Sequence, residues 1–342
     1  MSHSSFSRWL SSFPEAEHSV YSQNGEDGVI QHLLSFVGVG GQRSYVEFGT
    51  EDGMQVNTRL LREAHGWSGV LMDGGYENAS IGLIRTMITE ANIVALLQRF
   101  GVPHPELGLL SVDTDCFDFW ITRAILEAGY RPRILINEVN AALAPYKALS
   151  VPHRLDPRAG PNGGNHSMCW GSSTRHDDRP TRWFGASVGA FVKLNIRFGY
   201  SMVYCESVGI NCFSVRNDLL PHTAARAGGG GANSAGVAAS GLVSTRLLNN
   251  STALHRPPRY GLLKDACTHK FDLLQRPFVR VSASAGVAPL DSPTEPDTHS
   301  KDERKARAVW DGISSDAAAT WRRTHEYFRP KPIARRLVCR FR

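Results

Sequence analysis

The sequence predicts an α/β protein whose doubly wound, mostly parallel, Rossmann-like sheet is closed by an antiparallel hairpin. From residue 44 to residue 199, apolar segments of strand length alternate with segments of helical periodicity, which is typical of parallel sheets. Two further apolar runs, SMVYCE and INCFSVRND, follow with only SVG between them. Because so short a link permits a hairpin and not a parallel crossover, the last strand is expected to run antiparallel to its neighbour.

Each element of the alternation has its own boundary residues. The first strand, 44–50, lies between Gly40-Gly41 and a glycine-bearing turn. The helix after it carries its apolar residues on one face and stops before Gly66, and the next helix is expected to begin at Thr89 as its cap. The remaining segments are the strands SGVLMDGG, LGLLSVDTD and RPRILINEVNAAL and the helices ITEANIVALLQRFG, WITRAILEAGY and WFGASVGAFVKLNIRFGY.

Composition shifts divide the chain into five parts. Pro and Gly mark a long loop within the second part, Gly and Ala mark a low-complexity segment, and Pro, Ser and Asp mark a linker. We expect a helical lead-in (1–43), an α/β domain (44–222) with a lid-like loop (151–182), a disordered low-complexity insertion (223–241), a C-terminal extension of the domain (242–281), and a linker and basic tail in which a helix can form (282–342).

The composition bounds the class of protein. With 42% hydrophobic and 20% charged residues in 342, the chain is globular rather than disordered. No transmembrane segment is expected, because no apolar run reaches 18 residues, and the N-terminus does not have the pattern of a signal peptide, so the default location is cytoplasmic. The six cysteines are scattered without a metal-type pair, which predicts reduced, structural thiols.

The formal net charge of +6 has much of its excess in the C-terminal segment RPKPIARRLVCRFR. That segment has no interleaved base-stacking aromatics and no known binding module, so a solvated tail is expected and no specific nucleic-acid partner. The sequence does not indicate an oligomeric state.

Acidic residues follow most of the predicted strands. In a doubly wound sheet, ligands bind beyond the carboxyl ends of the strands, and those ends meet at one edge. Five acids fall there, and their coincidence is the strongest functional feature of the sequence: Glu47, Asp73, Asp113, Asp115 and Glu138.

The turn after the first strand, GTEDG, favours a nucleoside ligand without phosphate. Its glycines, Gly49 and Gly53, are not spaced as in a dinucleotide loop, and Glu51 and Asp52 would repel a pyrophosphate by about 1 kcal/mol each. S-adenosylmethionine has no phosphate, carries a sulfonium and an ammonium group, and has ribose hydroxyls that an acid after the second strand, Asp73, can accept. A sheet closed by an antiparallel hairpin is also the arrangement of class I methyltransferases.

Several blocks, in order between residues 21 and 220, resemble the FkbM-like S-adenosylmethionine-dependent methyltransferases, and more closely a branch related to them. The blocks are YSQNGEDGVI, YVEFGTEDGMQVNTRLL, GWSGVLMDGGYENASI, ITEANIVALL, LLSVDTDCFDFW, YRPRILINEVNA, WFGASVGAFVKL and GYSMVYCESVGINCFSVRNDLL. The resemblance implies a class I methyltransferase fold and O-methyl transfer to a hydroxyl of a sugar or other small molecule.

The resemblance also implies roles for single residues. Asp73 would hold the ribose, and Asp113 and Asp115 would lie beside the sulfonium and the acceptor. A block before the first strand would close over the pocket; alternatively it is a helix N-terminus with Asn24 as cap. The residues that would contact or shape the cofactor site are Glu47, Gly49, Asp52, Gly53 and Asn57, and those of the covering block are Gln23, Asn24, Glu26 and Asp27.

Methyl transfer to a hydroxyl needs a base, for which Asp113 or Asp115 is the first candidate and Glu138 the next. Alternatively, acids of this edge hold Mg²⁺, which would orient and acidify the acceptor, with Asp113, Asp115, Glu138 and Asn140 as ligands; Asp118 is expected to be a helix cap instead. A non-catalytic binding protein that retained the fold is the main alternative, whereas a nicotinamide-dependent oxidoreductase and a metal-dependent hydrolase are disfavoured.

Overall fold

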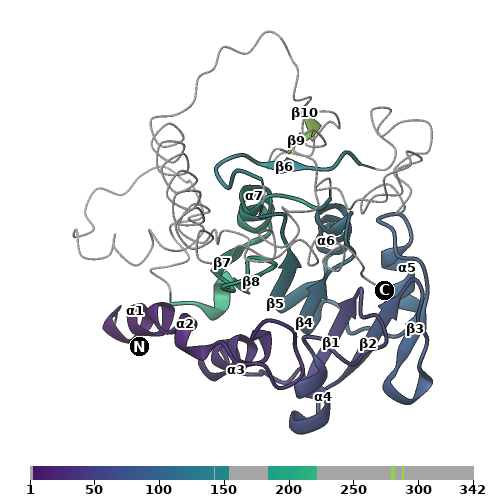
Figure 1. The fold of residues 1–342 in the computed structure, drawn as a ribbon, viewed down its shortest axis with the longest axis horizontal. Coiled ribbons are helices and arrows are strands. Elements are labelled where there is room, and N and C mark those ends of the chain that lie inside the picture. The colour runs from purple at the N-terminus through teal and green to yellow at the C-terminus, as the bar shows by residue number, and fades with distance from the viewer. Residues whose placement is uncertain (1–2, 142, 154–183, 222–278, 282–286, 289–342) are drawn as a thin grey trace, which may run out of the picture.

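The computed structural model describes residues 3–141, 143–153, 184–221, 279–281 and 287–288. Most of the lid-like loop, the whole low-complexity insertion, and nearly all of the C-terminal extension, the linker and the basic tail therefore lie outside the described residues. The described part is built around a seven-stranded sheet with helices on both faces (Figure 1).

The sheet is mostly parallel and has the order β3-β2-β1-β4-β5-β8-β7. Neighbouring strands from β3 to β5 pair in parallel, whereas β8 is antiparallel to both β5 and β7. The predicted α/β, Rossmann-like sheet with a closing antiparallel hairpin is confirmed. Its strands are β1 (Ser44–Phe48), β2 (Ser68–Asp73), β3 (Leu83–Arg85), β4 (Glu106–Val112), β5 (Arg131–Glu138), β7 (Tyr200–Cys205) and β8 (Asn211–Arg216).

Each face of the sheet packs against its own set of helices, because successive side chains of a strand point to opposite faces. Val46 and Phe48 of β1 belong to one buried cluster, and Tyr45 between them belongs to the other. The first cluster includes α5 (Ile93–Arg99), α6 (Asp118–Glu127) and α7 (Val188–Phe198), and the second includes α1 (His3–Ser11), α2 (Phe13–Ala16), α3 (Glu26–Val37) and α4 (Arg59–His65) (Figure 1).

Smaller elements complete the described part. A second sheet joins β6 (Leu149–Ser150), β9 (Val279–Val281) and β10 (Val287–Ala288), so the end of the segment predicted as a C-terminal extension pairs with β6. Two short 3₁₀ helices follow β2 and β8: η1 (Ala79–Ile81) and η4 (Asn217–Leu219). No helix in the described ranges has both the length and the apolar character needed to cross a membrane.

The predicted starts of α5 and α3 are wrong. Thr89 is not the cap of α5; Asn92 is, and Thr89 instead exchanges hydrogen bonds with Asn92 one turn earlier. Asn24 is not the cap of α3, because Gly25 occupies that position with a φ of +96°, a conformation that favours glycine. In both cases the structure places the cap one or more residues further along the chain than the sequence predicted.

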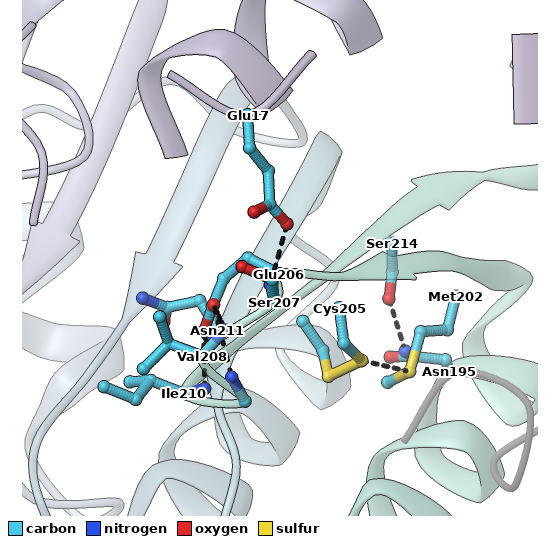
Figure 2. Close-up of a disulfide and its surroundings, with 12 residues drawn as sticks. Glu17, Asn195, Met202, Cys205, Glu206, Ser207, Val208, Ile210, Asn211 and Ser214 are labelled. Carbon is cyan, nitrogen blue, oxygen red and sulfur yellow. Dashed lines mark hydrogen bonds between the residues drawn. A yellow bond between two sulfur atoms is a disulfide. The ribbon is translucent and has the colours of Figure 1, made fainter. Parts of the chain in front are cut away.

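The expectation of reduced thiols is wrong for Cys205 and Cys212. These residues face each other in the register of β7 and β8, with 4.0 Å between their Cα atoms, and form a disulfide. The disulfide lies beside Met202 at the turn end of the hairpin (Figure 2). Cys116 is disulfide-bonded as well. The disulfide could not be predicted from the sequence, because it depends on which residues of β7 and β8 lie opposite each other.

Replacing Cys205 and Cys212 together by alanine is expected to lower the free energy of unfolding by about 2 kcal/mol, since the bond closes a loop of sequence separation 7 and restricts the unfolded chain. Urea unfolding without reductant measures the loss. In the presence of dithiothreitol the difference from the native chain should vanish, and equal stability of the two proteins without reductant would contradict the expectation.

Candidate functional site

The acids predicted at the strand ends lie along one edge of the sheet because β2, β1, β4 and β5 are consecutive parallel neighbours. Asp73 and Glu138 are the last residues of β2 and β5, and Glu47 is the last but one of β1. Asp113 and Asp115 follow β4 directly. The parallel register therefore places the five acids at the edge where doubly wound sheets bind ligands.

The glycine turn after β1 requires its two glycines. A Cβ on Gly49, whose φ is +67°, would lie 1.5 Å from the carbonyl oxygen of Asp113. A Cβ on Gly53, with φ +80°, would lie 2.5 Å from Cδ1 of Ile81. The turn is thus pressed against the loop after β4 on one side and against η1 on the other, and only glycine permits that approach.

Glu47 is a buried anchor for the segment behind this turn. Its carboxylate accepts hydrogen bonds from the backbone N–H groups of Asn57 and Thr58, at 2.8 and 2.9 Å, and from the Thr58 hydroxyl at 2.6 Å. Burial raises the pKa of Glu47 from 4.5 to about 7, although these hydrogen bonds oppose the rise. Asn57 in turn donates from Nδ2 to Ser111 Oγ of β4, so both residues fix the start of α4 to the strand ends.

Asp73 joins the turns that follow β1 and β2. Its Oδ2 accepts from the backbone N–H of Glu51 at 2.9 Å, and its Oδ1 accepts from those of Gly75 and Tyr76 at 2.7 and 3.2 Å. The exposed Asp52 accepts from Met54 N–H at 3.0 Å and holds the shape of the same turn. The acid of the second strand therefore lies directly against the acidic glycine turn of the first.

Apolar side chains beside these turns were not identified from the sequence. Met54, Tyr76 and Met87 are each half exposed or slightly more. Met54 lies in the turn after β1, and Tyr76 follows β2; Met87 Cε lies 3.4 Å from the position that a Cβ on Gly74 would take. Large apolar residues exposed next to a polar site are typical of binding surfaces, and this exposure is a property that sequence pattern cannot show.

Asp113 and Glu138 lie together with a third acid, Asp118. One carboxylate oxygen from each lies within 4.8 Å of one from each of the others. Burial, followed by the negative charges of Asp115 and Asp118, raises the pKa of Asp113 well above its usual range, and burial raises that of Asp118 to about 7. Such a cluster holds either protons or a cation, because three negative charges at this spacing, two of them buried, repel strongly.

The membership of this cluster differs from the predicted metal set. The prediction that Asp118 caps α6 is wrong, because Phe117 takes the cap position and Asp118 is the first helical residue. Oδ1 of Asp118 accepts hydrogen bonds from the backbone N–H and the hydroxyl of Thr114. Asp115 is exposed, with a φ of +63°. Asn140 donates from Nδ2 to the Phe184 carbonyl at 2.9 Å, which ties the segment before α7 to the end of β5.

The block before β1 lies at the same edge. Asp27 Oδ2 accepts from three consecutive backbone N–H groups, those of Val20, Tyr21 and Ser22, at 2.6–2.8 Å. Glu26 Oε1 accepts from Nδ2 of Asn211, whose register partner is Glu138 at the end of β5. Both acids belong to the first turn of α3, as the helix interpretation predicted, and Gln23 is exposed just before it. Closure of this block over a ligand stays a prediction.

Tyr21, at the start of the block before β1, contacts Arg59 of α4. Tyr21 lies under the Arg59 guanidinium, 4.2 Å from ring centre to Cζ, and Arg59 donates to the Met54 carbonyl. The block before β1 therefore contacts the segment between the glycine turn and α4, which borders the site.

Comparison with models of protein families finds none that matches the chain, and comparison with curated proteins likewise finds no match.

Proposed function

We propose that the protein is an S-adenosylmethionine-dependent methyltransferase that acts on a hydroxyl of a sugar or other small molecule. The observation that carries the proposal is the contact between Asp73 and the backbone of Glu51. It joins an acid that suits ribose hydroxyls to a glycine turn whose own acids disfavour phosphate and suit a cationic ligand.

Three features of the described residues support this ligand. Oδ2 of Asp73, which accepts from Glu51 N–H, has a further lone pair for a hydroxyl donor, whereas Oδ1 already accepts from both Gly75 and Tyr76 N–H. Tyr76 and Met87 provide exposed apolar surface beside Asp73, which suits the face of a purine. The antiparallel hairpin of β7 and β8, which closes the parallel part of the sheet, is the feature from which the sequence predicted the methyltransferase class.

The cofactor supplies a methyl group on a positively charged sulfur, and the protein has to position the acceptor and remove its proton. Asp113 is the first candidate for the base, because burial and its acidic neighbours raise its pKa well above the usual range, and a carboxylate of higher pKa accepts a proton more readily. Asp115 on the same loop and Glu138, which contacts Asp113, are the alternatives that the sequence indicated. Asp113 is half-buried and therefore reachable from the surface.

Replacing Asp73 by alanine is expected to weaken S-adenosylmethionine binding at least about tenfold, because one hydrogen bond to a charged acceptor is lost together with the contacts that hold both turns. Isothermal titration of the native chain with S-adenosylmethionine and S-adenosylhomocysteine, with NAD as the negative ligand, measures the affinity. Glu77→Ala is the matched control, since Glu77 lies on the same loop and is exposed, with an ion pair to Arg85 at 4.0 Å.

The proposal requires binding of the two adenosyl ligands by the native chain and by Glu77→Ala. Absence of heat and of thermal stabilisation with both ligands would overturn it. Binding without turnover in a screen of hydroxyl-bearing acceptors would favour the alternative, a binding protein that retained the fold.

A further inference from the structure

The cluster of three acids at the candidate site includes Asp118, which the sequence analysis assigned to a helix cap instead. Asp113 comes from the loop after β4, Asp118 from the start of α6, and Glu138 from the end of β5. Three separate elements thus bring one carboxylate oxygen each to within 4.8 Å of the others. Asp118 and Glu138 are buried and Asp113 is half-buried, so the cluster opens toward the surface on the Asp113 side.

Asp118 gives a second, separate observation. Its side chain has no exposed surface, and while Oδ1 accepts two hydrogen bonds from Thr114, the buried Oδ2 has no hydrogen-bond partner. Gly185, whose φ is +54°, lies next to this oxygen: a Cβ there would be 3.8 Å from it. A fully buried carboxylate oxygen without a donor is costly unless a cation or a proton satisfies it.

We propose that Asp113, Asp118 and Glu138 form a binding site for a hard divalent cation, Mg²⁺ or Mn²⁺. The ligand chemistry fits, since all three donors are carboxylate oxygens, which such ions prefer. The spacing fits as well: oxygens bound to Mg²⁺ at about 2.1 Å are separated by roughly 3–4 Å, which the limit of 4.8 Å accommodates with small movements.

The cation would add a function that the protein chain alone lacks. Bound at the end of β4 and β5, it lies beside the position proposed for the acceptor, where it can bind the acceptor oxygen and lower the pKa of that hydroxyl. With Asp113 as a ligand of the cation, Asp115, exposed on the same loop, would be the base that accepts the proton in its place. This role rests on the proposed function, whereas cation binding itself does not.

Titration of the native chain with Mn²⁺, followed by the loss of the free-ion signal in electron paramagnetic resonance, tests the site without S-adenosylmethionine. We expect one Mn²⁺ per chain, displaced by Mg²⁺. Asp118→Asn and Glu138→Gln should each weaken Mn²⁺ binding by at least about tenfold. A residue that only hydrogen-bonds to a metal ligand already contributes about tenfold to affinity, and a ligand itself contributes at least as much. Glu77→Gln, which removes an exposed charge on the loop after β2, should bind within about twofold of the native chain.

Circular dichroism checks that each variant folds, and two variants are used so that misfolding of one leaves the other as a test. No Mn²⁺ binding at millimolar concentration, or equal binding by both variants and the native chain, would overturn the cation site. S-adenosylmethionine binding by protein treated with EDTA would then leave the proposed function standing. Mn²⁺ binding without any adenosyl ligand binding would keep the cation site and remove the methyltransferase proposal.

Discussion

Gly49→Ala is expected to lower the free energy of unfolding by at least about 3 kcal/mol, the largest effect of any single substitution at the site. The new Cβ would lie 1.5 Å from the Asp113 carbonyl oxygen. Both sides of this contact are backbone, and the parallel pairing of Phe48 with Val112 holds the strand ends immediately before them. Relief therefore requires separation of β1 from β4, and chemical denaturation monitored by circular dichroism measures the cost.

Gly66→Ala is the matched control for the backbone conformation. Gly66 ends α4 with a φ of +64°, and no heavy atom lies within 4 Å of its Cβ position. Its substitution should cost only about 1 kcal/mol, which is the ordinary strain of an alanine at positive φ. Equal losses for the two variants would show that the contact with Asp113 contributes nothing beyond backbone strain.

The second large effect is a dependence of stability on pH through Glu47. Below pH 4.5 this carboxyl is protonated in both the folded and the unfolded chain, so its contribution is fully present. As the pH rises from 4.5 to about 7, the unfolded chain loses the proton while the buried carboxyl keeps it, and unfolding becomes easier. Above about 7 the contribution stays lost, and the difference corresponds to up to about 3 kcal/mol.

Denaturant unfolding of the native chain between pH 4 and 8, in EDTA, measures this dependence. Asp118, with its pKa also raised to about 7, contributes in the same direction, so the share of Glu47 is the difference between the native chain and Glu47→Gln. Glu47→Gln should lose less stability across this range. Glu51→Gln, at an exposed position on the same turn, should follow the native profile. A Glu47→Gln profile parallel to the native one would contradict the raised pKa.

The alternation of strands and helices was predictable because the apolar runs of β1, β4 and β5 are buried on both faces of the sheet for most of their length. The run of β2 is buried only at Leu71 and Met72, but it is apolar and bounded by glycine. The short SVG link likewise predicted the antiparallel hairpin. β3 was missed: it has three residues, one of them Arg85, and its position at the edge of the sheet demands no apolar run. A strand that short is defined by its pairing with β2, which is a tertiary contact.

The site was predictable in position but less so in composition. The parallel pairing of the strands brings the acids at their ends to one edge of the sheet, independently of the hydrogen bonds that each acid makes. The position of the site at this edge was therefore predictable from the sequence pattern. Asp118 was assigned to a helix cap because its spacing from Asp113 does not reveal the tight loop between them. That loop passes through Asp115 at a φ of +63° and turns the start of α6 back toward the cluster. Glu47 was correctly placed at the edge, but its hydrogen bonds to Asn57 and Thr58 depend on the fold.

The N-terminal segment is joined to the last hairpin of the sheet, and this determines when the fold can be completed during synthesis. Glu17 Oε1 accepts from Ser207 N–H across a separation of 190 residues (Figure 2). The same oxygen accepts from the Tyr204 hydroxyl across 187 residues, and Glu26 accepts from Asn211 across 185. A ribosome must therefore deliver β7 and β8 before the first helices gain these partners. Contacts so distant in sequence slow folding, so the emerging chain keeps part of the α1–α3 surface uncovered until the hairpin arrives.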